Sequence, residues 1–113
     1  MEFKFPKKLE VADTIFEIKY DKTQPVGSGS FGYGMDGNPA YLKFTIKYID
    51  KYPLRFLTIL MHELMEILHV EDNTRLYRSD AKNDIASYIF VSDHDQFSDR
   101  CCRLSGLLSK FIK

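Results

Sequence analysis

The sequence predicts a single α+β domain over residues 1–113, and three patterns support this prediction. Apolar and polar residues alternate in the first third of the chain, which is typical of half-buried strands. Apolar residues then recur at helical spacing between Pro53 and Val70, and again near the C-terminus. A chain of this length can bury one modest core. We therefore expect a small antiparallel sheet packed on the 53–70 helix, with a further hairpin and a C-terminal helix.

Three segments of the first half are predicted to be strands. Residues 15–20 (IFEIKY) alternate with period two, and residues 40–49 (AYLKFTIKYI) are aromatic and β-branched. Between them, glycines and serines surround a short strand at 30–35 (SFGYGM). The dipeptide Asp36-Gly37 is a hairpin signal, so residues 40–49 are expected to return beside the short strand.

The second half is predicted to form a helix, a hairpin and a last helix. Pro53 suits the first helical turn, and polar residues after Val70 end the first helix. The segments 75–78 (RLYR) and 85–91 (IASYIFV) read as two strands flanking a turn. Asp93 and Gln96 have the spacing of a capping box at the start of the last helix. Its expected apolar stripe comprises Phe97, Cys101, Leu104, Leu108 and Phe111.

Charge and cysteine content exclude several classes of protein. Sixteen basic residues balance sixteen acidic ones, so electrostatics gives no reason to expect a nucleic acid or an anionic membrane as partner. The N-terminal residues are too charged for a secretory signal, and charged residues interrupt the apolar run at 54–70. The neighbouring Cys101 and Cys102 cannot bridge distant segments. We expect a cytoplasmic protein with reduced thiols and no membrane span.

The 53–70 helix carries polar residues where a core helix should be apolar. Five of them fall within roughly 60° of one another at about 100° per residue: Arg55, Thr58, His62, Glu66 and His69. Glu63 lies on the shoulder of this stripe. The stripe could be the solvated face of an amphipathic helix, but it is narrow and uses His and Glu. The floor of a cleft fits this composition better.

Metal binding explains the spacing within the stripe. Residues i and i+4 of a helix are surface neighbours, so His62 and Glu66 can reach one ion. Glu63, one residue on from His62, would overhang that ion as the general base does in the HExxH arrangement. The motif here is HExxE, and zinc accepts a carboxylate in place of the second imidazole.

A catalytic zinc site usually has three protein ligands, and one is missing from this helix. His69 lies about 10.5 Å along the helix axis from His62, so we expect a supporting or structural role for it. His94 is the preferred third ligand, because it begins the last helix directly after a strand. It could equally be a solvated residue in an acidic first turn. The possible substitutes are Glu71, Asp72, Asp93 and Asp95.

Three stretches of the chain are LTILMHELMEI (57–67), GYGMDGNPAYLKFTI (32–46) and DHDQFSDRCCRLSGLL (93–108). In these stretches the chain resembles small phage-encoded, zincin-like metallopeptidases. The resemblance spans roughly residues 12 to 112. It implies a strand pair leading into a zincin-like active-site helix, with Zn²⁺ held by His62, Glu66 and His94 and water activated by Glu63. The sequence departs from the commoner family pattern at Glu66, where a histidine is usual.

The favoured hypothesis is therefore a zinc-dependent metallopeptidase-like hydrolase of peptide or amide bonds, acting in the cytoplasm, or in the host cytoplasm if phage-encoded. An alternative is a catalytically weak or inactive metal-binding phage protein that acts by binding a protein partner. A third is an α+β interaction module without metal. Two histidines and a carboxylate also suit non-haem iron, but the i, i+4 spacing with an adjacent glutamate favours zinc. No lysine follows a phosphate-loop pattern.

Overall fold

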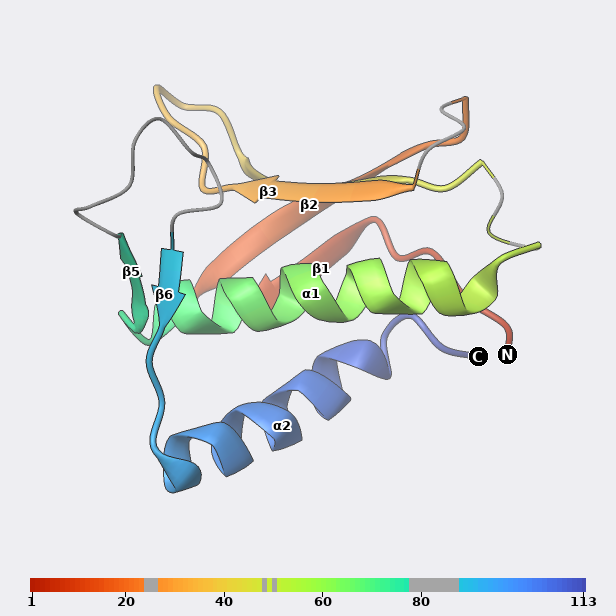
Figure 1. Ribbon diagram of the computed structural model, residues 1–113. Helices are drawn as coiled ribbons and strands as arrows, with labels where there is room; N and C mark the ends of the chain where they lie inside the picture. The colour runs from red at the N-terminus through yellow and green to blue at the C-terminus, as the bar shows by residue number, and fades with distance from the viewer. Residues whose placement is uncertain (24–26, 48, 50, 78–87) are drawn as a thin grey trace.

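The computed structural model describes residues 1–23, 27–47, 49, 51–77 and 88–113 of the chain. It confirms the α+β class: two helices accompany a four-stranded sheet and a separate two-stranded hairpin (Figure 1). The elements are β1 (Lys8–Val11), β2 (Thr14–Asp21), β3 (Ser28–Gly32), β4 (Ala40–Thr45), α1 (Pro53–Glu71), β5 (Arg75–Tyr77), β6 (Tyr88–Phe90) and α2 (His94–Leu108).

The four-stranded sheet is mixed, whereas the sequence suggested an antiparallel one. Its strand order is β1-β2-β4-β3, and β4 pairs in parallel with β2 while the other two pairs are antiparallel. The reason is that the chain forms β3 at the outer edge before it returns as β4 between β3 and β2. A short connection makes β3 and β4 antiparallel, so β4 must run in the direction of β2.

The turn between β3 and β4 confirms the predicted hairpin. Asp36 and Gly37 both have positive φ angles, of 55° and 82°, as the primed hairpin turns require. The amide of Asn38 donates a 3.0 Å hydrogen bond to the carbonyl oxygen of Met35, which closes the turn. The strand before it is shorter and earlier than the predicted 30–35.

Strand β1 was not predicted. It pairs antiparallel with β2, with Leu9 opposite Phe16, and buries Leu9 and Val11. The connecting turn contains Ala12 with a φ of 53°, an unusual conformation for alanine that costs about 1 kcal/mol. Neither Asn-Gly nor Asp-Gly, the pairs that mark a hairpin in sequence, occurs in this turn.

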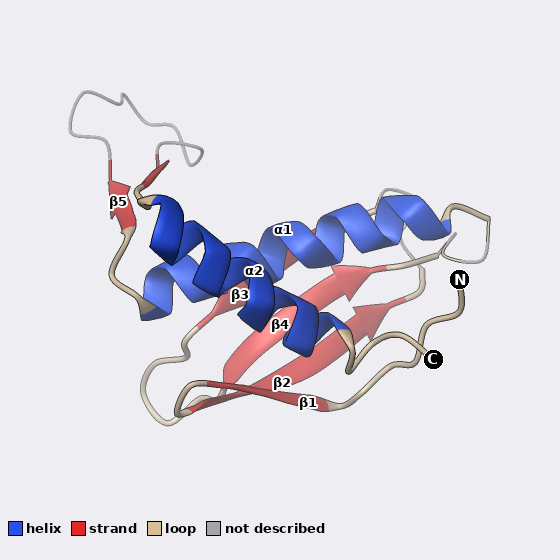
Figure 2. Cartoon of the chain, turned by 90° about the horizontal axis from the view of Figure 1, so that it is seen from below, coloured by secondary structure: helices blue, strands red, loops and turns tan. Residues whose placement is uncertain are grey.

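Both helices cover the same face of the sheet (Figure 2). Along β2, Phe16 and Ile18 point into the core and Ile15 is 56% exposed, which confirms the predicted alternation. The core combines sheet residues with the inner faces of the helices: Phe16, Ile18, Leu42, Phe44, Phe56, Leu60, Leu64, Ile67, Leu68, Leu104 and Phe111. Among the described residues, neither helix is long and apolar enough to cross a membrane.

The helix starts agree with the predictions, but the stripe of α2 does so only in part, since Leu104 and Phe111 are buried and Leu108 packs against the core. Pro53 occupies the first turn of α1, and Asp93 and Gln96 form the capping box of α2 with hydrogen bonds of 2.8 and 3.0 Å. Phe97 and Cys101, however, are exposed. Arg100 is buried on the inner side of this end of α2 instead, because it has partners at the end of α1.

The predicted hairpin after α1 is present as β5 and β6, which pair antiparallel from Arg75–Phe90 to Tyr77–Tyr88. Both strands are shorter than expected within the described part of the chain. Residue 78, residues 85–87 and the predicted turn at 79–84 lie outside the described residues.

A buried arginine fastens α2 to the end of α1. The Arg100 side chain is only 2% exposed, and its Nε donates a 2.9 Å hydrogen bond to Asp72 Oδ2 at the C-cap of α1. Arg103 donates to the same oxygen. Burial alone would raise the pKa of Asp72, but the hydrogen bonds and charges of Arg103 and Arg100 outweigh this and hold it below the ordinary 3.8. The carboxylate is therefore ionised throughout the neutral range.

We predict that Asp72→Asn lowers the free energy of unfolding by about 3 kcal/mol, because it leaves the buried Arg100 without its counter-charge. The folded pKa of Asp72 lies below the unfolded one, so its contribution is present above about pH 4 and is lost as pH falls. Urea unfolding at pH 7 and pH 3 measures both effects. The control is Asp99→Asn, which removes an exposed pair with Arg103 and should change stability by less than about 1 kcal/mol. Equal effects of the two variants would contradict the assignment.

Candidate metal centre

Helix α1 brings His62, Glu63 and Glu66 together. One ligand atom from each residue lies within 4.8 Å of the others. In the described part of the chain, these three residues form the group whose spacing could hold a metal ion. His62 and Glu66 are one turn apart, so their side chains are neighbours on the helix surface. The local spacing of the HExxE motif is thus sufficient to assemble three potential ligands.

The His62 and Glu66 side chains are separated by the distance expected of two zinc ligands. His62 Nε2 lies 3.2 Å from Glu66 Oε2. Two atoms that are each about 2.0–2.1 Å from a tetrahedral zinc ion lie about 3.3 Å apart. The His62 side chain is 68% exposed and that of Glu66 is 17% exposed, so the pair is open to solvent on the His62 side. The donor set and its spacing therefore fit zinc.

Glu63 is buried beneath the edge strand. Its Cγ would be 2.7 Å from a Cβ at Gly29, so the absence of a side chain in β3 provides the space for the glutamate. Among the described residues, its carboxyl group has no hydrogen-bond partner. Burial raises the pKa of Glu63, the negative charge of Glu66 adds to this, and His62 and Arg75 oppose it. The Glu63 residue is 7% exposed, and its carboxylate oxygens are not among the fully buried unpartnered atoms of the described structure, so solvent or a ligand can still reach them.

Arg75, which sequence analysis missed, completes the surroundings of Glu66. Its Nη1 lies 2.9 Å from Glu66 Oε1, while the other carboxylate oxygen faces His62. The guanidinium stacks 3.8 Å from the ring centroid of Tyr88 and 5.6 Å from that of Phe31. Arg75 therefore fixes the orientation of the carboxylate and leaves Oε2 for a cation. Its position depends on how the predicted β5–β6 hairpin lies against α1, and no local pattern in the sequence reveals that placement.

His69 lies outside this group, as the sequence suggested. It is buried, its Nδ1 is 2.8 Å from the Thr74 hydroxyl, and its ring packs edge-on against Phe90 with 5.0 Å between centroids. Burial lowers the pKa of His69 and the charge of Arg100 lowers it further, against a weaker upward effect of Asp72. The ring is therefore neutral at pH 7. Its contacts tie the end of α1 to the hairpin.

The structure does not bring His94 to the other predicted ligands. Its side chain is 91% exposed, with Asp95 3.8 Å away, and it is not part of the described metal-ligating group. The capping box at Asp93 sets the direction of the first turn of α2, whose start lies on the side of α1 away from the sheet (Figure 1). The preferred third ligand, His94, is therefore not part of the described metal-ligating group in this structure.

The four possible substitutes for His94 are also engaged elsewhere or remote from the group. Glu71 accepts a 2.9 Å hydrogen bond from the Tyr33 hydroxyl and a 3.3 Å one from Thr14. Asp72 pairs with arginines of α2, and Asp93 caps that helix. Asp95 is exposed beside His94. Within the described residues, the three ligand positions are thus confined to the HExxE motif.

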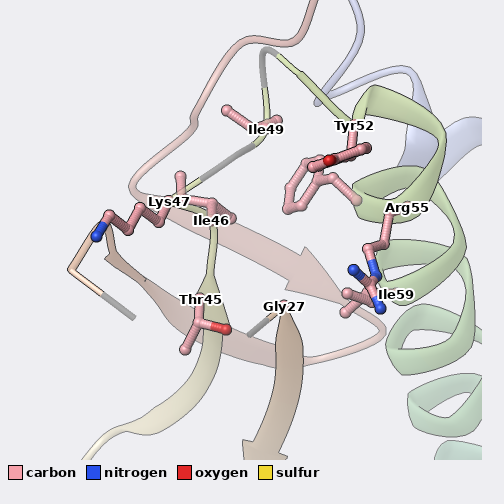
Figure 3. A pocket seen from close by; sticks show the side chains of 9 residues that line it. Gly27, Thr45, Ile46, Lys47, Ile49, Tyr52, Arg55 and Ile59 are labelled. Carbon is pink, nitrogen blue, oxygen red and sulfur yellow. The ribbon is translucent and has the colours of Figure 1, made fainter. Parts of the chain in front are cut away.

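A small pocket at the other end of α1 is separate from this centre. Figure 3 shows Tyr52, Arg55 and Ile59 reaching it from α1 and its cap, while Ile46 reaches it from the end of β4. Its volume is about 30 Å³, which is room for about one water molecule. Its lining contains no carboxylate, imidazole or thiol, so it offers no typical metal ligand.

Comparison of this chain with models of known protein families, with curated protein sequences and with solved structures found no match. The geometry of His62, Glu63 and Glu66 and of their neighbours is therefore the basis on which a function can be assigned.

We predict that Gly29→Ala disturbs the metal centre. The added Cβ would lie 2.7 Å from Glu63 Cγ and 2.9 Å from Ile59 Cγ2, so α1 must move away from β3 or Glu63 must turn. Overpacking of this kind costs about 1–3 kcal/mol, measurable by urea unfolding. Chelator competition should show weaker zinc binding in the same variant.

The matched control is Gly106→Ala in α2, where a Cβ would meet nothing within 4 Å. This change should leave zinc binding unaltered and stabilise the helix by up to about 1 kcal/mol. If Gly29→Ala were as stable as the wild type with the same zinc affinity, the close packing of Glu63 on β3 would be contradicted.

Proposed function

We propose that this protein is a zinc-dependent hydrolase of peptide or amide bonds, with its centre at His62, Glu63 and Glu66. The observation that carries the proposal is the cluster of His62, Glu63 and Glu66, in which the largely buried Glu63 has a carboxylate oxygen within 4.8 Å of the other two ligand atoms. A raised pKa beside potential metal ligands is characteristic of catalytic groups.

Each residue has a defined part in this proposal. His62 Nε2 and Glu66 Oε2 bind the ion, and Arg75 holds the other oxygen of Glu66. Zinc, when bound, lowers the pKa of a water ligand towards about 7 and polarises the scissile carbonyl. Glu63 would accept a proton from the attacking water and pass it to the leaving amine. The raised pKa of Glu63 favours this exchange, since the group then holds a proton more readily than an exposed glutamate.

The edge of the sheet favours an extended peptide as the substrate. Among the described strands, β3 pairs only with β4, so its outer edge has no neighbouring strand. The same strand covers Glu63 through Gly29. A peptide added along this edge would pass close to the proposed base, with main-chain hydrogen bonds supplying affinity.

The exposure of His94 favours a second candidate function. Without a third ligand from outside the motif, His62 and Glu66 would hold the ion with Glu63 as the remaining protein ligand, and no free base would be left. The protein would then be a metal-stabilised phage protein that binds a protein partner without cleaving it. The two candidates differ in the role of Glu63, which makes that residue the place to test them.

We place the activity in the cytoplasm. Cys101 and Cys102 are free and exposed on α2. Exposed thiols persist in reducing compartments and tend to be oxidised outside them. Cell fractionation with an antibody to the chain would test this assignment.

We predict that the tag-free protein binds one zinc ion per chain and that His62→Ala loses it. The loss of affinity should exceed the roughly 10–100-fold that removal of a supporting partner costs. His94→Ala is the matched control, because this exposed ring lies outside the group, and it should keep full zinc content. Elemental analysis after zinc loading and desalting measures both. A wild type without zinc would remove the proposal, and zinc loss in His94→Ala would restore His94 as a ligand.

We further predict that Glu63→Gln keeps zinc and loses hydrolysis of a peptide library, because the amide cannot accept the proton. Cleavage is measured by mass spectrometry after incubation with zinc-loaded protein. Retained zinc with retained cleavage would contradict the base role. Loss of zinc in this variant would instead make Glu63 a ligand and favour the partner-binding function.

A further inference from the structure

A second pocket adjoins the proposed metal centre. It has a volume of about 290 Å³ and is lined by His62, Met65, Glu66, His69 and Phe90. Two of these residues, His62 and Glu66, also belong to the metal-ligating group. The volume is just below the usual range for drug-sized ligands, so the pocket suits a single side chain of a larger ligand.

The walls of this pocket are apolar and aromatic. Met65 of α1 is half-buried, and Phe90 of β6 is 45% exposed. Phe90 is held in place by its edge-on contact with the His69 ring. One oxygen of Glu66 is paired with Arg75 and the other is assigned to the proposed ion, so with the ion bound the pocket offers no free negative charge to a lysine or arginine. Such a lining favours an uncharged aromatic group.

The hydrogen bonds of His69 determine which of its ring nitrogens carries the proton. The Thr74 hydroxyl accepts a hydrogen bond from Arg100 Nη2 at 2.8 Å and donates its own hydrogen to the carbonyl oxygen of His69. A hydroxyl has one hydrogen, so the arrangement that makes all three of these contacts hydrogen bonds has the hydroxyl oxygen accept at the 2.8 Å contact with His69 Nδ1. In this arrangement Nδ1 carries the proton of the neutral ring.

The other nitrogen of His69, Nε2, is consequently an acceptor. Among the described residues it has no hydrogen-bond partner, although the His69 side chain lines the pocket. A ligand that fills the pocket without offering a donor would leave this nitrogen buried and unpaired, which weakens binding. The pocket thus combines aromatic walls with one unused acceptor.

We propose that this pocket binds the side chain of a tyrosine in the peptide substrate, whose phenol hydroxyl donates to His69 Nε2. The inference rests on the proposed function, because the substrate residue enters the pocket beside the metal ligands His62 and Glu66. Tyrosine supplies both the aromatic body and the donor. Phenylalanine has the body alone, so it measures the contribution of the hydrogen bond.

The test compares binding of two peptides, acetyl-Gly-Tyr-Gly-amide and acetyl-Gly-Phe-Gly-amide, by NMR titration of the zinc-free and zinc-loaded protein. The tyrosine peptide should bind about 10-fold more tightly than the phenylalanine peptide and shift the resonances of Met65, His69 and Phe90. Long-range proton–nitrogen spectra should show His69 protonated at Nδ1. Equal affinities, shifts elsewhere in the protein, or a proton at Nε2 would overturn the proposal.

Variants separate the acceptor from the walls. His69→Asn keeps an N–H for Thr74 and removes Nε2, so the two peptides should then bind equally. Phe90→Ala should weaken both peptides and keep the preference for tyrosine. Phe97→Ala, an exposed aromatic of α2 that does not line the pocket, is the control and should bind as the wild type does. An unchanged tyrosine preference in His69→Asn would contradict the role of the acceptor.

The outcome also separates this inference from the proposed function. A tyrosine preference in a protein that binds no zinc would remove the hydrolase and leave the pocket as a peptide-recognition site. Zinc binding and peptide cleavage without a tyrosine preference would overturn the pocket assignment alone.

Discussion

The close approach of α1 to β3 at Gly29 is the contact on which the geometry of the candidate site depends. A glycine in the edge strand lets the helix lie near enough for Glu63 to be buried between them. Burial in turn raises the pKa of Glu63 and isolates its carboxyl group from hydrogen-bond donors in the described structure. A side chain at Gly29 would separate the two elements, and the glutamate would then be an ordinary solvated residue of a helix.

The end of α1 is fixed by two further polar connections, so the centre lies on a rigid part of the chain. Arg100 of α2 binds Asp72 and Thr74, and the Thr74 hydroxyl contacts the His69 ring. Arg75, one residue later, reaches back to Glu66. The segment directly after α1 therefore connects α2, the hairpin and the candidate ligands. Ligands held by supporting hydrogen bonds are oriented before an ion arrives, which reduces the entropy cost of binding.

The sequence predicted those features that depend on local spacing and missed those that depend on tertiary placement. His62 and Glu66 meet because the period of a helix places residues i and i+4 together. The capping box of α2 was predicted for the same reason, yet the direction of that helix turned His94 to solvent. Strand β1 escaped notice because its turn, Ala12-Asp13, lacks the Asn-Gly or Asp-Gly pair that marks a hairpin in sequence. Arg75 could not be assigned, since its partner Glu66 lies nine residues earlier in α1 and the two meet only through the turn that follows this helix.

The distribution of charge within the centre indicates where a cation is needed. Glu66 already has Arg75 at one oxygen and His62 at the other, so its negative charge is compensated in the absence of an ion. Glu63 is the more buried of the two carboxyl groups, and no donor of the described structure reaches it. A divalent ion bound at His62 and Glu66 would therefore contribute most by stabilising the ionised form of Glu63. The same charge that favours binding would prepare this residue to act as a base, so affinity and reactivity would depend on one buried carboxyl group.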